Sequence, residues 1–143
     1  MNLDQDDRGS SILVVEDNRF LCEMICAWLQ GAGYIARGVQ SERQSAAALE
    51  EGGFDLVLVD VDIPREQAIA LLETVRNKLG CGGMVLLTGA VRHDELLKWA
   101  GDAACVAMEK PYSFFALGLV IRAALARSRS DGSLPQTSST CGG

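Results

Sequence analysis

The sequence lacks the clusters of cysteine and histidine that build metal sites and disulfide frameworks. It contains one histidine, His93, and its five cysteines form no CxxC pair or Cys/His cluster. A zinc site and a disulfide scaffold are therefore not expected. Cys22 and Cys26 lie one turn apart on a predicted helix. We expect them to be small, partly buried side chains in a reducing compartment, and the alternative is a redox-sensing pair.

Long apolar runs and an excess of positive charge are also missing. No apolar stretch reaches the roughly 18 residues that a membrane helix needs. The start of the chain, MNLDQDDRGS, is too acidic and polar for a signal peptide. The net charge is −6, whereas a nucleic-acid-binding protein needs a basic face to pair with phosphates. We therefore expect a cytoplasmic protein that binds neither membrane nor nucleic acid.

What the chain does have is the composition of one globular domain. Apolar residues make up 48% and charged residues 22% of its 143 residues, which is a normal balance for a packed domain. Residues 1–10 are acidic and polar, and residues 128–143 are rich in Ser, Gly and Thr. Such segments bury too little apolar surface to fold. The prediction is a disordered lead (1–10), a folded domain (11–127) and a disordered tail (128–143).

Within the predicted domain, apolar runs alternate five times with helical patterns. Strands are expected at Ile12–Val15, Tyr34–Gly38, Leu56–Asp60, Met84–Thr88 and Cys105–Met108, and helices at Arg19–Gln30, 41–51, Glu66–Leu79, Arg92–Ala100 and Tyr112–Arg127. This alternation predicts an α/β domain with a doubly wound, five-stranded parallel sheet and helices on both faces. In such sheets, ligands bind outside the carboxyl ends of the strands.

Polar residues gather at those carboxyl ends. Asp60 ends the most apolar short run of the chain, where a buried carboxylate costs several kcal/mol unless a cation compensates it. The polar residues at the ends of the other strands are Glu16, Asp17, Thr88 and Lys110. Each alone has a plainer explanation: a helix cap, a strand-end residue or a solvated charge. Their convergence on one edge predicts a site.

The charges of these residues favour a divalent cation. Carboxylates about 5 Å apart repel by roughly 3 kcal/mol per pair at an effective dielectric constant near 20. Mg²⁺ prefers carboxylate, carbonyl and water oxygens. With Lys110 it would neutralise a phosphoryl group, while Thr88 donates a hydrogen bond and Asp60 acts as the nucleophile.

Four motifs then resemble one known family. They are ILVVEDN (Ile12–Asn18), LVLVDVDIP (Leu56–Pro64), VLLTGA (Val85–Ala90) and EKPYSF (Glu109–Phe114). In this order they are similar to the receiver domain of two-component response regulators, over about residues 11–127. The resemblance implies the flavodoxin-like strand order 2-1-3-4-5.

The resemblance also implies roles for the site residues. Asp60 would accept a phosphoryl group from a sensor histidine kinase or a histidine phosphotransfer protein. Asp17 and Asp60 would ligate Mg²⁺ directly, Glu16 mainly through water, and Asp62 through its backbone carbonyl. Thr88 and Lys110 would hold the phosphoryl oxygens. The chain would be a signalling phosphoacceptor and not an enzyme with turnover, and it would act by docking to a downstream protein.

Two features depart from the family pattern or extend it. Members commonly have an aromatic residue three positions before the lysine, where this chain has Ala107, so the route of signal transmission stays open.

The last predicted helix has a core-facing stripe and a second apolar stripe that includes Phe115, Leu119 and Ala126. A surface helix normally has one stripe. The second could pack on a partner or on a second copy of the chain, or consist of scattered surface residues.

Two other functions remain possible from the sequence. One is a receiver-like interaction module that works without phosphorylation, which Ala107 would permit. The other is a phosphatase similar to the haloacid dehalogenases, in which Asp60 is the nucleophile and Asp62 the general acid/base. That family places its acidic pair after the lysine, whereas Glu16 and Asp17 precede it here. Stoichiometric phosphorylation, as opposed to turnover of a phosphate ester, distinguishes the receiver from the phosphatase.

Overall fold

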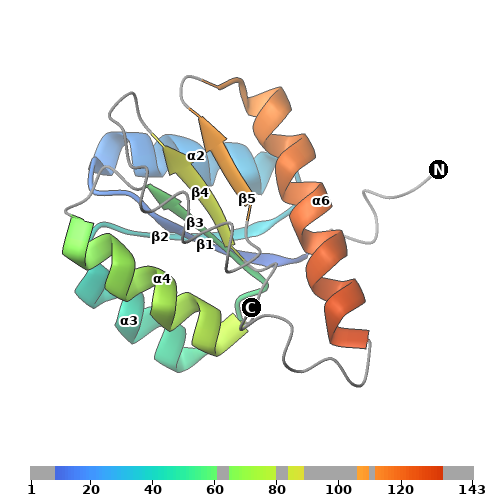
Figure 1. The fold of residues 1–143 in the computed structure, drawn as a ribbon. Helices are drawn as coiled ribbons and strands as arrows, with labels where there is room; N and C mark the ends of the chain where they lie inside the picture. Colours follow the sequence, from blue (N-terminus) through green and yellow to red (C-terminus); the bar gives the residue numbers. More distant parts are fainter. Residues whose placement is uncertain (1–8, 61–64, 80–83, 89–105, 110–111, 134–143) are drawn as a thin grey trace.

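The described part of the chain is a parallel α/β sandwich (Figure 1). The structure is a computed structural model, and it describes residues 9–60, 65–79, 84–88, 106–109 and 112–133. Its strands are β1 (Ser11–Val15), β2 (Ile35–Val39), β3 (Leu56–Asp60), β4 (Met84–Thr88) and β5 (Val106–Glu109). All neighbouring strands are parallel, in the order β2-β1-β3-β4-β5. This confirms the expected 2-1-3-4-5 arrangement.

Helices cover both faces of the sheet. Ile12 and Val14 of β1 join the core beneath α2 (Arg19–Gly31) and α6 (Phe114–Ser133). Leu13 and Val15 join the core beneath α3 (Glu42–Glu51) and α4 (Arg65–Leu79). The aliphatic run of β3, Leu56–Val59, alternates between the same two cores and is fully buried. Burial on both faces is why this strand is a continuous apolar run and not an alternating pattern.

Local signals set the ends of α3 as predicted. The Ser41 hydroxyl accepts a hydrogen bond from the Gln44 N–H at 3.1 Å and caps the helix. Gly52 and Gly53 follow its end with φ of 79° and 92°. A backbone in this left-handed region favours glycine, because other residues would strain there. The sequence therefore specifies both where α3 begins and where it ends.

The last helix, α6, runs further than expected. Ser113 caps it by accepting the Ala116 N–H at 3.0 Å, so the helix begins at Phe114 and not at Tyr112. It ends at Ser133, beyond the predicted end at Arg127. The expectation of a disordered tail is thus wrong for residues 128–133. Extending an existing helix by one residue is far easier than nucleating one, so a polar stretch can continue it.

Several smaller boundaries also differ. The disordered lead is wrong at its last two residues, because Gly9 donates to the Gly33 carbonyl at 2.9 Å and Ser10 accepts from the Ile35 N–H at 2.9 Å. β2 and β5 each lie one residue further along than predicted, at Ile35–Val39 and Val106–Glu109. The predicted helix at 92–100 lies outside the described residues, as do 1–8 and 134–143.

Candidate functional site

The strand register brings the candidate site residues to one edge of the sheet. Val15 of β1 pairs with Val59 of β3, and Asp60 pairs with Leu87 of β4. Thr88, the next residue of β4, pairs with Glu109 of β5. Because the strands are parallel and in step, β1, β3, β4 and β5 all end at this edge. It is the edge where open α/β sheets bind ligands.

The loop that follows β1 carries the two predicted acidic residues in different environments. Glu16 is buried, with 2% of its surface exposed, whereas Asp17 is exposed. The Glu16 N–H donates to the carbonyl of Val39, at the end of β2, at 3.0 Å. One carboxylate oxygen of Glu16 accepts the backbone N–H of Asn18 at 3.1 Å. The loop thus fixes a buried carboxylate beside an exposed one.

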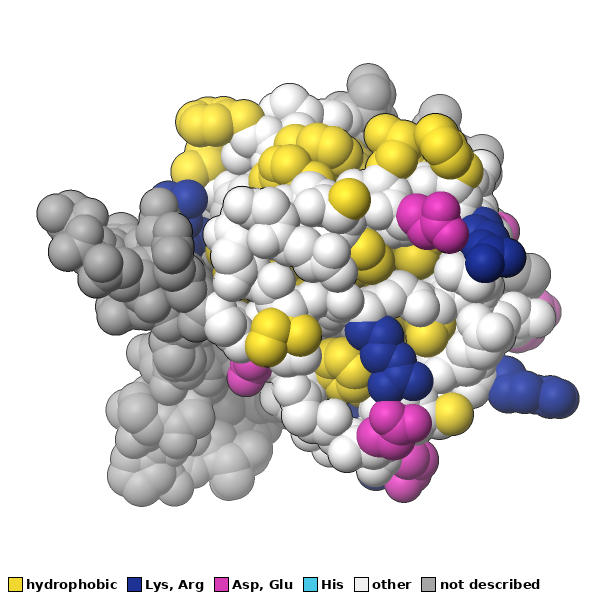
Figure 2. All heavy atoms as spheres, turned by 180° about the vertical axis from the view of Figure 1, so that it is seen from behind, with side chains coloured by type: hydrophobic (Ala, Val, Ile, Leu, Met, Phe, Trp, Pro, Cys, Tyr) yellow, Lys and Arg dark blue, Asp and Glu magenta, His cyan; other side chains and the backbone are white. Residues whose placement is uncertain are grey.

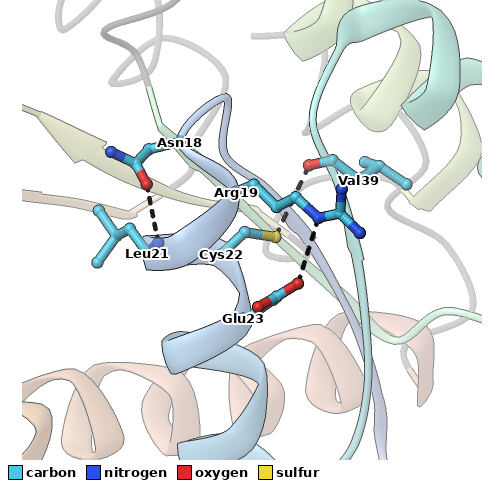
Figure 3. Close-up of polar contacts among 6 residues, drawn as sticks. All are labelled: Asn18, Arg19, Leu21, Cys22, Glu23 and Val39. Carbon is cyan, nitrogen blue, oxygen red and sulfur yellow. Dashed lines mark hydrogen bonds and ion pairs between the residues drawn. The ribbon is translucent and has the colours of Figure 1, made fainter.

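Asn18 is the residue that caps α2. Its side-chain oxygen accepts the N–H of Leu21 at 3.0 Å, and its own backbone is extended (Figure 3). Asp17 and Asn18, the two polar residues directly before α2, are both residue types that can cap a helix. Since Asn18 does so, the Asp17 carboxylate is not used for capping. One turn into the helix, Arg19 and Glu23 form an exposed ion pair at 3.3 Å.

The remaining candidate residues are placed by their backbones alone or lie outside the described residues. Asp60 ends β3 and Thr88 ends β4, as predicted. Ala107 lies on β5, where it pairs with Leu86. Lys110 directly follows β5, and Asp62 follows β3 by two residues. Both lie outside the described residues, so their roles stay predictions.

The donors at this edge are chemically suited to Mg²⁺. Glu16 and Asp17 offer carboxylate oxygens on one short loop, and Asp60, a third acidic residue, ends the neighbouring strand β3. Hard oxygen ligands are the kind that Mg²⁺ binds, and it usually keeps several waters. The burial of Glu16 fits a residue that orients water near a metal, and the exposure of Asp17 leaves its oxygens accessible to an ion.

The cysteine pair beneath this loop is packed and not activated. Cys22 is buried, and its Sγ lies 3.9 Å from the carbonyl oxygen of Val14 and 3.9 Å from that of Val39. Figure 3 shows the contact with Val39. Burial raises the pKa of Cys22 and raises that of Cys26 to about 12. A thiol with a raised pKa is a poor nucleophile. These thiols therefore fit the expected packing role better than redox sensing.

Comparison with known families identifies the class of protein. The model of the response regulator receiver domain matches residues 12–122. The chain therefore belongs to the response regulator receiver family. Receiver domains as a family interact with a histidine kinase or another phosphodonor and use Mg²⁺ in phosphorylation. The four sequence motifs had predicted this family, and its fold is the one observed.

Curated relatives are transcriptional regulators that are longer than this chain. The chain is 28% identical over 121 residues to the transcriptional regulatory protein BasR of Escherichia coli K12, with 85% of this chain and 54% of BasR aligned. It is 30% identical over 128 residues to ZraR of Salmonella typhimurium LT2, with 89% of this chain and 29% of ZraR aligned. The chain thus spans about half, or less, of these relatives.

Solved structures support the same fold. A response regulator receiver domain protein from Clostridium thermocellum superposes with a TM-score of 0.75 at 20% identity, covering 85% of this chain and 98% of that one. The non-phosphorylated HemR receiver domain from Leptospira biflexa gives 0.70 at 21% identity, covering 90% and 98%. Within the described residues, no helix is both long and apolar enough to cross a bilayer.

One arrangement in the site was not evident from the sequence. The sequence predicted Glu16 as a metal-site residue. It did not predict that Glu16 would be buried, or that its carboxylate would accept a hydrogen bond from the Asn18 N–H. The signal that could have pointed to it is the order of residues: an acid, a second acid and then a capping asparagine directly before a helix. A cap fixes the local backbone, so it also fixes what the preceding side chains can reach.

Proposed function

We propose that Asp60 is the phosphoacceptor of this receiver domain. In the proposed step, a carboxylate oxygen of Asp60 attacks the phosphorus of a phosphohistidine. A bond from oxygen to phosphorus forms, the bond from phosphorus to nitrogen breaks, and the leaving imidazole takes up a proton. The observation that carries the proposal is the register, which ends β1, β3, β4 and β5 at one edge. Asp60 thereby lies between the acidic loop and Thr88.

The other residues of the site hold and balance charge. Asp17, Asp60 and the carbonyl of Asp62 would bind Mg²⁺ directly, and Glu16 would act through a bound water. Mg²⁺ supplies charge neutralisation for the transferring phosphoryl oxygens. Thr88 would donate a hydrogen bond to one of these oxygens and Lys110 would pair with another. The exposure of Asp17 and the anchored burial of Glu16 support this division of roles.

The proposed partners follow from this chemistry. A sensor histidine kinase or a histidine phosphotransfer protein would supply the phosphoryl group in the cytoplasm. The protein would be phosphorylated once per chain and would not turn over a small substrate. It would pass the signal on by docking to a downstream protein. The family membership supports these proposals.

A second surface is proposed for protein contacts. Phe115 is 77% and Leu119 is 49% exposed on α6, and Ala126 is exposed further along. The core-facing residues Leu117, Ile121 and Leu125 are buried, so the helix has the two apolar stripes predicted from the sequence. The exposed stripe would pack on a second copy of the chain or on the downstream protein.

The decisive experiment is phosphotransfer from the histidine kinases of the host, with Asp60→Asn as the control. Intact mass spectrometry should show the gain of one phosphoryl group on the wild type, and none on Asp60→Asn. The transfer should need Mg²⁺. Beryllofluoride with Mg²⁺ should also shift the NMR spectrum of the wild type. No phosphorylation and no spectral change would contradict the proposal and favour a phosphorylation-independent module. Sustained hydrolysis of a small phosphate ester would favour a phosphatase.

A further inference from the structure

Asn18 makes two different hydrogen bonds in the acidic loop. Its side-chain oxygen accepts the Leu21 N–H at 3.0 Å and caps α2, while its backbone N–H donates to the Glu16 carboxylate at 3.1 Å. Figure 3 shows the side chain turned toward the first turn of the helix. The Asn18 carbonyl then accepts the Cys22 N–H at 2.9 Å as the helix begins. One residue therefore links the start of α2 to a buried carboxylate.

The loop is held at both of its ends. At one end, the Glu16 N–H is bound to the Val39 carbonyl at 3.0 Å. At the other, the cap keeps Asn18 in an extended conformation, with φ −83° and ψ 110°. This conformation determines where the Asn18 N–H points, and so where the Glu16 carboxylate is held. Asp17 lies between the two fixed points, so its exposed carboxylate is carried on a restrained backbone.

We infer that Asn18 is a positioning residue for the metal site, acting through Glu16 and Asp17 without itself binding the ion. This inference rests on the proposed function, because it assumes that these two carboxylates bind Mg²⁺. Without the cap, the loop samples more conformations, and part of the free energy of binding is used to order it. Binding of Mg²⁺ should then weaken, since only a fraction of the molecules holds the competent arrangement.

The chain contains its own control for this inference at the next helix. Ser41 caps α3 in the same way, accepting the Gln44 N–H at 3.1 Å. It also follows a strand of the same sheet, two residues after the Val39 that anchors Glu16. No acidic residue directly precedes Ser41, where Gln40 stands. Removing either cap should destabilise a helix by a similar amount, but only one removal should change the metal site.

The experiment measures Mg²⁺ affinity in three variants by NMR titration of the Asp17 amide. Asn18→Ala removes the cap, Asn18→Ser replaces it with another neutral capping oxygen, and Ser41→Ala removes the cap of α3. We expect Asn18→Ala to raise the dissociation constant about three- to tenfold, which corresponds to the loss of one side-chain cap. Asn18→Ser and Ser41→Ala should stay within about twofold of the wild type.

Further measurements separate positioning from a general loss of stability. Thermal unfolding without Mg²⁺ should show similar losses in Asn18→Ala and Ser41→Ala. Amide exchange at position 18 should accelerate in Asn18→Ala only, because the N–H is released from Glu16. If Asn18→Ala does not fold, Asn18→Gly repeats the titration, since glycine is tolerated at a cap with only a small loss of helix stability.

Three results would overturn the inference. The first is an unchanged affinity in Asn18→Ala, and the second is an equal loss in Ser41→Ala. The third is a failure of Asn18→Ser to recover binding, which would mean that capping is not what positions the carboxylates. A wild type that binds no Mg²⁺ would instead contradict the proposed function itself, so the two failures can be told apart.

Discussion

The two faces of the sheet are packed in different ways. The buried residues beneath α3 and α4 are all aliphatic, such as Leu71 and Val75, and the partly buried ring of Phe54 packs against them. The face beneath α2 and α6 adds aromatic rings and thiols: Trp28 and Phe114 stack with their centroids 4.9 Å apart, and Cys22 lies in the core. The residues of both clusters are almost fully excluded from solvent, and the two faces differ in the kinds of contact that they make.

The helices of the two faces also differ in the apolar side chains that they expose. Phe20 and Met24 on α2, and Phe115 and Leu119 on α6, are large and exposed. Of the described side chains, α3 and α4 expose no large apolar residue. Figure 2, seen from behind, shows hydrophobic side chains gathered along the upper edge of the molecule.

The helices that begin near the site lie on both faces of the sheet. α2 begins directly after the acidic loop, and α6 begins four residues after Lys110. Both helices begin close to site residues, as does α4, which begins five residues after Asp60, and the Trp28–Phe114 contact joins α2 to α6. Phe20 and Phe115, two of the exposed apolar residues, lie in the first turns of α2 and α6.

The largest effects should come from a matched pair of core truncations, one on each face. Leu29 on α2 and Leu71 on α4 are both fully buried. Leu29→Ala and Leu71→Ala should each lower the free energy of unfolding by about 2–5 kcal/mol, through lost burial and the cavity left behind. Urea unfolding measures both. A loss below about 1 kcal/mol in one variant alone would show that one face is loosely packed, contrary to the comparison above.

A smaller effect is expected where β2 passes the thiols. A Cβ added at Gly38 would lie 2.5 Å from the Cys22 Sγ and 3.1 Å from the Cys26 Sγ. Gly38→Ala should therefore destabilise the protein by about 1–3 kcal/mol, because the buried sulfur of Cys22 has to move. Urea unfolding of Gly38→Ala, with and without Cys22→Ala, tests the cause. If the two changes are independent, the contact is not responsible.

Two other glycines serve as controls for Gly38→Ala. At Gly31, an added Cβ would meet nothing within 4 Å, and at Gly118 its nearest neighbour would be Trp28 at 3.4 Å, an ordinary contact. Both glycines lie in helices, where alanine is favoured over glycine by about 0.5–1 kcal/mol. Gly31→Ala and Gly118→Ala should be neutral or slightly stabilising. Destabilisation by either would mean that α2 or α6 is packed more tightly than the contacts indicate.

Much of this architecture could be predicted from local sequence patterns. The apolar run Leu56–Val59 specified β3, and Ser41 with Gly52 specified both ends of α3. Motif order along the chain identified the family and with it the strand order. These features depend on residues close in sequence, or on a pattern long enough to be specific, which is why they could be read directly.

What could not be predicted depends on contacts between distant segments. The end of α6 at Ser133 was missed because a polar composition does not stop a helix that is already formed. The burial of Glu16 was missed because it needs the end of β2 beside β1, where Val39 accepts the Glu16 N–H. The approach of both thiols to Gly38 likewise arises only when α2 packs on β2.

The thiols allow a test of the α2 face that depends on pH. Burial raises the pKa of Cys26 to about 12, above the roughly 8.5 of an exposed thiol. The folded state therefore holds the Cys26 proton up to a higher pH than the unfolded state does. The stability linked to this protonation is fully present below about pH 8.5 and is lost as the pH rises toward 12.

Alkylation measures this protonation directly. At pH 8, iodoacetamide should react with Cys26 in the folded protein at least about tenfold more slowly than in the urea-unfolded protein, because the thiolate is the reactive form. Peptide mass spectrometry identifies the modified residue. Between pH 8 and 10.5, Cys26→Ala should also lose less stability than the wild type. Equal rates in both states would contradict the assignment and reopen the redox alternative.

The smallest change in stability, and the most specific test of the difference between the faces, concerns the exposed stripe of α6. Leu119→Glu places a charge on the α2 and α6 face, and Asn77→Glu places the same charge on an exposed position of α4. Both should change the free energy of unfolding by less than about 0.5 kcal/mol. Leu119→Glu alone should abolish self-association in light scattering, or slow binding of the downstream protein, because a buried unpaired charge opposes an apolar interface. A concentration-independent monomer mass for the wild type, with unchanged partner binding in Leu119→Glu, would reduce the stripe to scattered surface residues and leave only the internal packing to distinguish the two faces.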